Sequence, residues 1–194
     1  MHLSGILLWF KTTGVMTKDR SQVILRALEL SDVELLYQWE NDKRIWQVSN
    51  TLVPFSRYIL KKYVENSFKD IYEMKQLRLM IDVKTGPDKF RSVGSVDLFD
   101  FDPYHLRAGV GILIAADNER GKGYATDALK ELIAYAFNTL QLNLLYCNIS
   151  TANIASISLF KKAGFTLIGI KKKWNRTTAG YEDEALLQLI HDRS

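Results

Sequence analysis

Arg-Gly-Lys-Gly-Tyr-Ala at residues 120–125 decides the fold, because it has the composition of an anion-binding turn that opens a helix. An apolar run at 110–115, of the length of a buried strand, precedes it, and apolar residues then recur at helical spacing as far as Leu140. Gly121 and Gly123 let the backbone bend sharply and approach a ligand closely. The free N–H groups and dipole of the helix start then favour an anion such as a pyrophosphate.

Two better-known phosphate loops do not match this stretch. A P-loop requires G-x-x-x-x-G-K-[ST], which the chain does not contain. A dinucleotide-binding turn requires a third small residue where Thr126 stands, and an acidic residue about 20 positions later, which is also missing. A plain strand-to-helix turn that merely uses glycine remains the alternative. The pattern that is left is R-x-x-G-x-A.

A second motif follows after one predicted helix and one predicted strand. Residues 153–165 read N-I-A-S-I-S-L-F-K-K-A-G-F, a short helix closed by Gly164. Together, the two segments resemble the R-x-x-G-x-A loop and the N-x-x-[AS]-x-x-[LI]-[YF]-x-K-x-G-F signature of the GNAT N-acetyltransferase superfamily. The resemblance extends from about Val23 to Ile190 and is closest in pattern to spermidine and ribosomal-protein acetyltransferases.

The predicted elements alternate along the chain. Strands are expected at 23–28, 77–84, 92–101, 106–115, 143–150, 165–173 and 181–190, and helices at 31–40, 56–73, 123–139 and 153–163. Ser31 and Glu34 form a capping box for the first helix, and Ser56 is the N-cap of the second. The order predicts a three-layer α/β fold of the GNAT type, with a mixed central sheet of about seven strands and about four flanking helices.

Composition indicates one globular domain. The chain has 194 residues, of which 47 % are hydrophobic and 25 % charged, and a single core can serve this length. Residues 21–194 are assigned to one domain and residues 1–20 to an N-terminal extension outside the fold. The apolar run at 3–10 is short and has no basic residue before it, so a signal peptide is not expected.

Charge, cysteine content and hydropathy restrict the partners. A net charge of +4 suits an anionic cofactor and gives no argument for nucleic acid, so no nucleic-acid partner is expected. The single cysteine, Cys147, excludes an internal disulfide and points to a reducing compartment, so a cytoplasmic location is expected. No apolar run approaches the ~20 residues of a bilayer span, and the three His are too scattered for a metal site.

The resemblance implies that acetyl-coenzyme A is the cofactor, used as a co-substrate. Backbone groups at the end of strand 106–115, where that strand is expected to splay from its neighbour, would bond the pantetheine arm, and the glycine loop would cradle the pyrophosphate. Asn153 would reach the pantetheine or the diphosphate, or would serve only as a helix N-cap. The predicted cofactor-binding residues are Leu113, Ile114, Ala115, Arg120, Gly121, Lys122, Gly123, Tyr124, Ala125, Thr126, Asn153, Ser156 and Phe160.

The chain departs from the family pattern at Phe160. Acetyl transfer to an amine needs a neutral nucleophile, support for the oxyanion and a proton for the departing thiolate. Many family members have a tyrosine at this position as the general acid. Phenylalanine has no proton to give, so no catalytic acid is assigned, and another group or water would protonate the thiolate.

The acceptor side is predicted from three residues. Asp97 alternates with apolar neighbours on a strand, so it faces away from them, where it could attract a cationic amine or accept its proton through water. Asp100 and Asp102 nearby are better explained as turn residues. The resemblance adds Trp46 as a wall of the acceptor groove, unless it is tucked into the core, and Tyr181 on the other side.

Three functions fit these motifs. The first is an N-acetyltransferase that acts on a small primary amine, with a polyamine as the best guess. The second acetylates the N-terminus of a protein, as ribosomal-protein acetyltransferases do. The third binds acetyl-coenzyme A without turnover, an alternative kept open by the missing tyrosine. A homo-oligomer is compatible with all three, and the sequence decides neither the acceptor nor the oligomeric state.

Overall fold

The computed structural model describes residues 23–49 and 51–192, so the extension predicted at 1–20 lies outside the described residues. Short 3-10 turns, η1 (Leu30–Asp32) and η2 (Asp117–Glu119), accompany the regular elements. These elements are β1 (Val23–Arg26), α2 (Val33–Glu40), α3 (Lys43–Ser49), α4 (Arg57–Asn66), α5 (Ile71–Met74), β2 (Leu77–Gly86), β3 (Lys89–Asp102), β4 (Arg107–Ile114), α6 (Tyr124–Asn138), β5 (Leu144–Ser150), α7 (Ile154–Lys162), β6 (Thr166–Thr177) and β7 (Gly180–Ile190).

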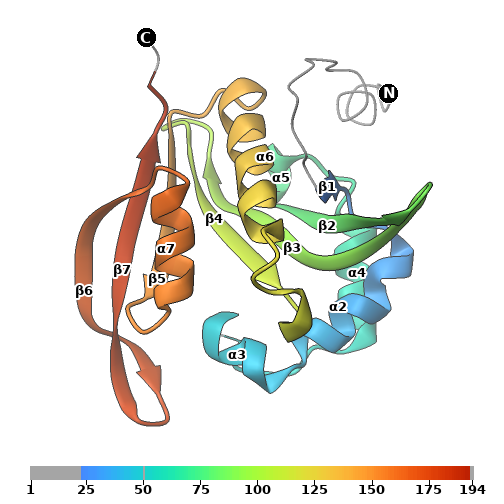
Figure 1. The fold of residues 1–194 in the computed structure, drawn as a ribbon, viewed down its shortest axis with the longest axis horizontal. Helices are drawn as coiled ribbons and strands as arrows, with labels where there is room; N and C mark the ends of the chain where they lie inside the picture. Colours follow the sequence, from blue (N-terminus) through green and yellow to red (C-terminus); the bar gives the residue numbers. More distant parts are fainter. Residues whose placement is uncertain (1–22, 50, 193–194) are drawn as a thin grey trace.

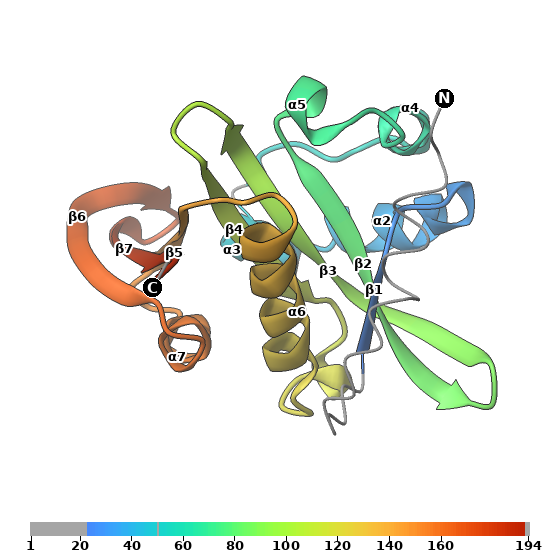
Figure 2. The ribbon, with the colours of Figure 1, turned by 90° about the horizontal axis from the view of Figure 1, so that it is seen from above.

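The strands form one seven-stranded sheet in the order β1-β2-β3-β4-β5-β7-β6. All neighbours are antiparallel except β4 and β5, which are parallel. A parallel pair requires a crossover, and α6 supplies it. Figure 2 shows α6 and α7 on one face of the sheet and α2 and α4 on the other. The predicted three-layer α/β fold is therefore confirmed, with α3 and α5 as short helices beyond the four that were expected.

Two hydrophobic cores hold these layers together. The larger core joins the sheet to α6 and α7, and includes Leu98 of β3 and Leu129 of α6, both fully buried. The smaller core joins α2 and α4 to the opposite face through Leu36, Leu60 and Met80. Each buried side chain of this size stabilises the fold by about 1.5–3 kcal/mol. The two cores therefore cover opposite faces of the sheet.

The predicted capping box of the first helix is wrong. The backbone N–H of Glu29 donates to Asp32 Oδ2 at 2.8 Å, so the box lies on Glu29 and Asp32. Glu34 instead forms an ion pair with Arg57 of α4 at 2.9 Å. The first helical turn is therefore capped by Glu29, two residues before the predicted cap Ser31.

The second predicted helix is shorter than expected. Ser56 is its N-cap as predicted, since its hydroxyl oxygen accepts from the backbone N–H of Ile59 at 3.2 Å. The helix ends at Asn66, and a new turn, α5, begins where the carboxylate of Asp70 accepts from the backbone N–H of Glu73. Side-chain caps therefore set both helix starts, and the second cap divides the single helix that the apolar spacing predicted.

Candidate active site

The parallel strands β4 and β5 pair over only three residues each, Arg107–Gly109 with Leu144–Tyr146. Beyond this point β4 continues beside β3 and β5 continues beside β7, and Figure 1 shows the two strands diverging towards α3. The predicted splay is therefore confirmed. One edge of β4 beyond Gly109 has no partner strand among the described residues, so its backbone groups are open to a ligand.

Alternation along β4 decides which backbone groups face this open edge. The N–H of Ala115 donates to the carbonyl of Val93 at 2.9 Å, and the carbonyl oxygen of Leu113 also lies against β3. In an antiparallel pair, successive residues direct their N–H and C=O groups to opposite sides. Ile112 and Ile114 therefore turn their backbone groups towards the gap, where the carbonyl of Ile114 already accepts from Arg120 Nε at 3.1 Å. Ile112 is absent from the sequence prediction, although strand alternation could have identified it.

The glycine loop has the geometry of an anion cradle. Gly121 and Gly123 adopt φ of 77° and 91°, and nothing lies within 4 Å of the position that a Cβ would take at either residue. Gly123 is the N-cap of α6, and its carbonyl accepts from the N–H of Thr126 at 2.9 Å. The N–H groups of Tyr124 and Ala125 come before this first intrahelical bond, so the helix itself leaves them free. The space in front of the loop is open to an anion.

The two cations of the loop already have carboxylate partners. Arg120 pairs with Asp117 at 2.8 Å, and Lys122 pairs with Glu119 at 3.1 Å. Glu119 also binds Arg91 at 3.0 Å, and the hydrogen bond from Lys122, followed by that from Arg91, lowers the pKa of its carboxyl group. The positive field of the loop therefore comes mainly from backbone N–H groups.

The helix α7 places the last predicted cofactor residues. Asn153 Oδ1 accepts from the backbone N–H of Ser156 at 3.1 Å, so the N-cap interpretation of Asn153 is correct. Phe160 is only 2 % exposed, and its ring meets that of Phe165 edge-on at a centroid distance of 5.0 Å. Contacts of Asn153, Ser156 and Phe160 with a cofactor stay predictions.

A cleft of ≈ 520 Å³ opens where β4 leaves β5. Residues 110–113 of β4 lie between its two walls. One wall comes from α2, β2 and β3, and the other from β5, β6 and β7. The polar and aromatic lining residues of the walls are Glu40, Gln76, Arg78, Ser95, Asp97 and Phe99 on the first, and Asn148, Lys171, Trp174, Asn175 and Glu184 on the second.

Asp97 lies on the first wall, bound to Arg78. These two residues are direct neighbours across β2 and β3, and Arg78 Nε donates to Asp97 Oδ1 at 2.6 Å. Arg78 Nη1 donates to Glu40 Oε1 at 2.5 Å. On β4, Gly111 is opposite Asp97, and a Cβ there would lie 3.8 Å from Asp97 Oδ2. The missing side chain therefore leaves room beside the carboxylate.

Burial changes the acidity of this pair. Burial raises the pKa of the Asp97 carboxyl group, Arg78 opposes the rise, and the net shift is upward. Burial also lowers the pKa of Arg78, but the charges of Asp97, Tyr63 and Glu40 outweigh it, so Arg78 stays protonated. A carboxylate with a raised pKa at the edge of a cleft is suited to accept a proton.

Of the other two aspartates of this stretch, Asp102 has the expected turn role, whereas Asp100 lies within β3, where its pairing with β4 shifts register. Asp102 accepts backbone N–H bonds from Tyr104 and His105 at 3.1 Å and 3.0 Å. Asp100 accepts a hydrogen bond from the hydroxyl of Tyr146 at 3.2 Å. Neither lines the cleft.

The two predicted aromatic substrate residues lie beside the cleft lining. The indole N–H of Trp46 donates to the backbone carbonyl of Glu40 at 2.6 Å, and its neighbour Ile45 lines the cleft. Tyr181 is 65 % exposed at the start of β7 and is not a lining residue. Trp174 of β6 lines the cleft instead and is missing from the sequence prediction. Substrate contacts of Trp46 and Tyr181 stay predictions.

Sequence reasoning also missed the charged partners in the cleft. Arg78 interrupts an otherwise apolar strand start at residues 77–81, and Glu184 precedes an apolar run at 185–187. A charged residue inside a buried strand is an unusual choice unless it is paired, so both could have been noticed. Their partners, however, lie on neighbouring strands and on α2, 9 to 38 residues away in the sequence.

The chain belongs to the GNAT acetyltransferase family, since residues 22–166 match the model of the acetyltransferase (GNAT) domain. It is similar to the spermidine N(1)-acetyltransferase of Vibrio cholerae, with 25 % identity over 176 residues that cover 89 % of this chain and 95 % of the relative. It is also similar to the uncharacterized N-acetyltransferase p20 of Bacillus licheniformis, with 25 % identity over 170 residues, 87 % of this chain and 93 % of the relative.

Solved structures show the same fold. The crystal structure of the V. cholerae spermidine N-acetyltransferase in complex with CoA and spermine superimposes with a TM-score of 0.78 at 22 % identity, covering 88 % of this chain and 96 % of that one. A further structure of that enzyme is described as dodecameric. The protein is thus an N-acetyltransferase that uses acetyl-coenzyme A, and the open β4 edge and glycine loop suit this donor.

The described residues add two negative findings. None of their helices is long and apolar enough to cross a membrane. Within the same residues, no group of three or more His, Cys, Asp or Glu side chains could hold a metal ion.

Proposed function

We propose that the protein transfers the acetyl group of acetyl-coenzyme A to a primary amine of a small polyamine, and that the cleft is the acceptor site. The position of Asp97 carries this proposal. Its carboxylate lies in the cleft next to Gly111. Gly111 belongs to β4, the strand whose open edge suits the donor. The relatives that are named spermidine N-acetyltransferases support the choice of acceptor.

The donor half of the site uses backbone more than side chains. The N–H groups at the start of α6, from Gly121 to Ala125, would bind the pyrophosphate, and the backbone of Ile112 and Ile114 would bind the pantetheine arm. When bound, acetyl-coenzyme A supplies the activated acetyl group. All of these proposed donor contacts lie within the single domain that we propose for residues 21–194.

Asp97 would prepare the acceptor. An amine attacks only when neutral, so the ammonium must first lose a proton. The Asp97 carboxylate, whose pKa burial raises, accepts this proton directly or through a water molecule. Arg78 holds the carboxylate in place and favours its ionised form, opposing the effect of burial. Phe160 takes no part in proton transfer, because its ring carries no ionisable group.

A panel of acceptors tests this proposal. Release of free thiol from acetyl-coenzyme A would be measured with spermidine, spermine, butylamine and a short peptide with a free N-terminus. We expect turnover with the polyamines and little with the peptide. Turnover of the peptide alone would make the protein an N-terminal acetyltransferase, and binding of the donor without any turnover would leave only a binding domain.

The donor site is tested by Gly123→Asp. This change adds a Cβ at φ of 91° and a negative charge next to the proposed pyrophosphate. A ligand at a hundredfold excess over its Kd stabilises the folded state by about 2.7 kcal/mol, which we expect for the native protein and not for the variant. Gly180→Asp is the control, because Gly180 also has a positive φ, 127°, but lies in the β6–β7 turn. Equal stabilisation of both variants would exclude the loop as the donor site.

A further inference from the structure

The second wall of the cleft holds an ammonium group of the protein itself. Lys171 Nζ lies 2.5 Å from Glu184 Oε2 and donates to Asn148 Oδ1 at 2.8 Å. The same nitrogen lies 4.6 Å from the centroid of the Trp174 ring. A carboxylate, an amide oxygen and an aromatic face, from β7, β5 and β6, thus surround one primary alkylammonium group.

This set of groups is a complete site for an alkylammonium ion. Charge-assisted hydrogen bonds and a cation–π contact are the interactions by which proteins bind such ions. Glu184 is only 6 % exposed, and Asn175 Nδ2 fixes its other oxygen at 3.0 Å, so the carboxylate is held in place. Lys171, Asn148, Trp174 and Glu184 all line the cleft that we propose for the amine acceptor.

The charge on the two walls differs. On the first wall, Glu40 and Asp97 face one cation, Arg78, so that wall carries a surplus negative charge for an incoming ammonium. On the second wall, Lys171 neutralises Glu184. A second ammonium group of the acceptor can therefore bind Glu184 only if the Lys171 side chain moves away from it. Lys171 lies on the edge strand β6, and its side chain is 30 % exposed, so it has solvent beside it.

We infer that Glu184, Asn148 and Trp174 form the subsite for the second ammonium of a polyamine, and that Lys171 is its tethered occupant, which the acceptor displaces. The inference rests on the proposed function, since it assigns the far end of the same acceptor. Lys171 therefore determines specificity: it lowers the affinity for diamines and longer polyamines and leaves monoamines unaffected.

Calorimetric binding of spermidine and butylamine to Lys171→Met tests this inference without requiring turnover. The variant should bind spermidine about tenfold more tightly, which corresponds to about 1.4 kcal/mol, and butylamine unchanged. Glu184→Gln should weaken spermidine binding about tenfold and leave butylamine unchanged, since a charge-assisted contact is lost. Lys172→Met is the matched control, because Lys172 pairs with Asp183 at 2.8 Å and does not line the cleft.

Each outcome is decisive. If the ratio of spermidine to butylamine affinity in Lys171→Met equals that of the native protein, with or without a lower Tm, the contacts of Lys171 only support the fold. This result would overturn the inference. So would a failure of every variant to bind spermidine. Tighter spermidine binding without acetylation by any variant would keep the subsite and reject the proposed transferase reaction instead.

Discussion

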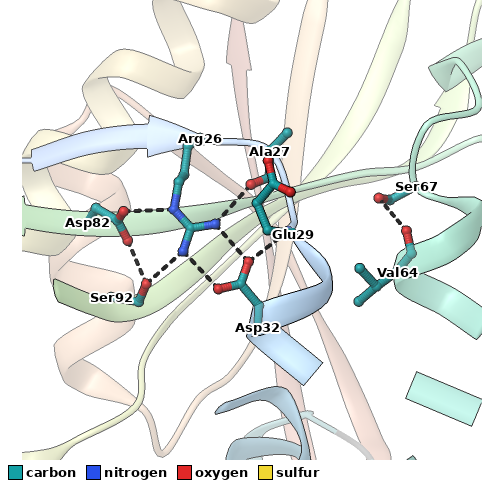
Figure 3. A network of polar contacts seen from close by, with 8 residues as sticks. All are labelled: Arg26, Ala27, Glu29, Asp32, Val64, Ser67, Asp82 and Ser92. Atoms are coloured by element: carbon teal, nitrogen blue, oxygen red, sulfur yellow. Dashed lines mark hydrogen bonds and ion pairs between the residues drawn. The ribbon is translucent and has the colours of Figure 1, made fainter. Parts of the chain in front are cut away.

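Two arginines of the sheet each join two carboxylates, but one network is closed and the other is open. Arg26 on β1 donates to both oxygens of Asp32, to Asp82 and to Ser92 (Figure 3). The hydroxyl of Ser92 in turn donates to the second oxygen of Asp82 at 2.6 Å. All four carboxylate oxygens therefore accept hydrogen bonds, and the network ties β1, β2 and β3 to the first helical turn.

Arg78 leaves its partners half satisfied. It donates to one oxygen of Asp97 and to one oxygen of Glu40, and the second oxygens carry no hydrogen bond within the described part of the chain. Both carboxylates line the cleft. The difference shows how one kind of ion pair serves two purposes: a closed network fixes the fold, and an open network presents charge to a ligand.

The acidities of the two networks differ in the same sense. Burial raises the pKa of Asp32, but the hydrogen bonds from Arg26 and the Glu29 backbone outweigh it, so the net pKa is lowered. Asp97 has fewer hydrogen bonds, and burial prevails, so its pKa is raised. Asp32 is thus held more firmly as an anion than an ordinary Asp, whereas Asp97 takes up a proton more readily.

The largest expected effect is on catalysis. Asp97→Asn keeps the shape of the side chain but removes its proton acceptor, so kcat/KM for spermidine should fall about 100-fold or more, as for a lost general base. Steady-state thiol release would measure it. Asp82→Asn in the closed network is the control and should keep kcat/KM within about twofold, because Asp82 does not line the cleft. Full activity of Asp97→Asn would show that Asp97 is a polar residue on the strand face without a role in catalysis.

The next effect is on stability. Asp32→Ala leaves Arg26 without its bidentate partner and should lower the free energy of unfolding by about 3 kcal/mol, with kcat/KM unchanged. Urea denaturation would measure the loss. Glu34→Ala, which breaks the exposed pair with Arg57, should cost much less. Equal losses of unfolding free energy in the two variants would show that the closed network stabilises the fold no more than an exposed ion pair does.

The smallest expected effect is a difference between the pH dependence of stability, set by Asp32, and that of activity, set by Asp97. Because the folded pKa of Asp32 is lowered, its ionised form stabilises the protein above the ordinary Asp value of 3.8, and this stability is lost as the pH falls through the folded pKa. Because the pKa of Asp97 is raised, activity should be lost at a higher pH than this stability.

This order is checked by pH profiles. Values of kcat/KM, referred to the concentration of protonated amine, and unfolding free energies would be compared from neutral to acidic pH. Asp97→Asn should flatten the acid limb of the rate profile, and Asp32→Ala should flatten the acid dependence of stability. An acid limb that persists in Asp97→Asn would contradict the role of this carboxylate in proton transfer.

Much of the fold could be predicted from local patterns. The glycine loop, the helical spacing after it and the alternation around Asp97 each depend on neighbours in the sequence, and the structure keeps all three. The predicted capping box failed because Glu29 and Asp32, rather than Ser31 and Glu34, form the box. The helix predicted across 56–73 is broken because Asp70 caps a new turn.

The charged partners in the cleft could not be found in this way. Arg78 meets Asp97 only through the register of β2 with β3. Glu40 binds Arg78 from the end of α2, a helix that precedes β2 in the chain. Lys171, Glu184 and Asn148 come together because β7 lies between β5 and β6 in the sheet. Strand order and register are properties of the whole fold, and single-chain patterns do not encode them directly.

A crystal structure with coenzyme A and spermidine bound would test the central claim most directly. We predict the pyrophosphate at residues 121–125, one amine of spermidine within about 3 Å of Asp97 Oδ2 or joined to it by a water molecule, and the chain of the ligand along β4. The closed network around Arg26 should be unchanged. Spermidine bound outside the cleft, or a pyrophosphate away from the glycine loop, would contradict the account.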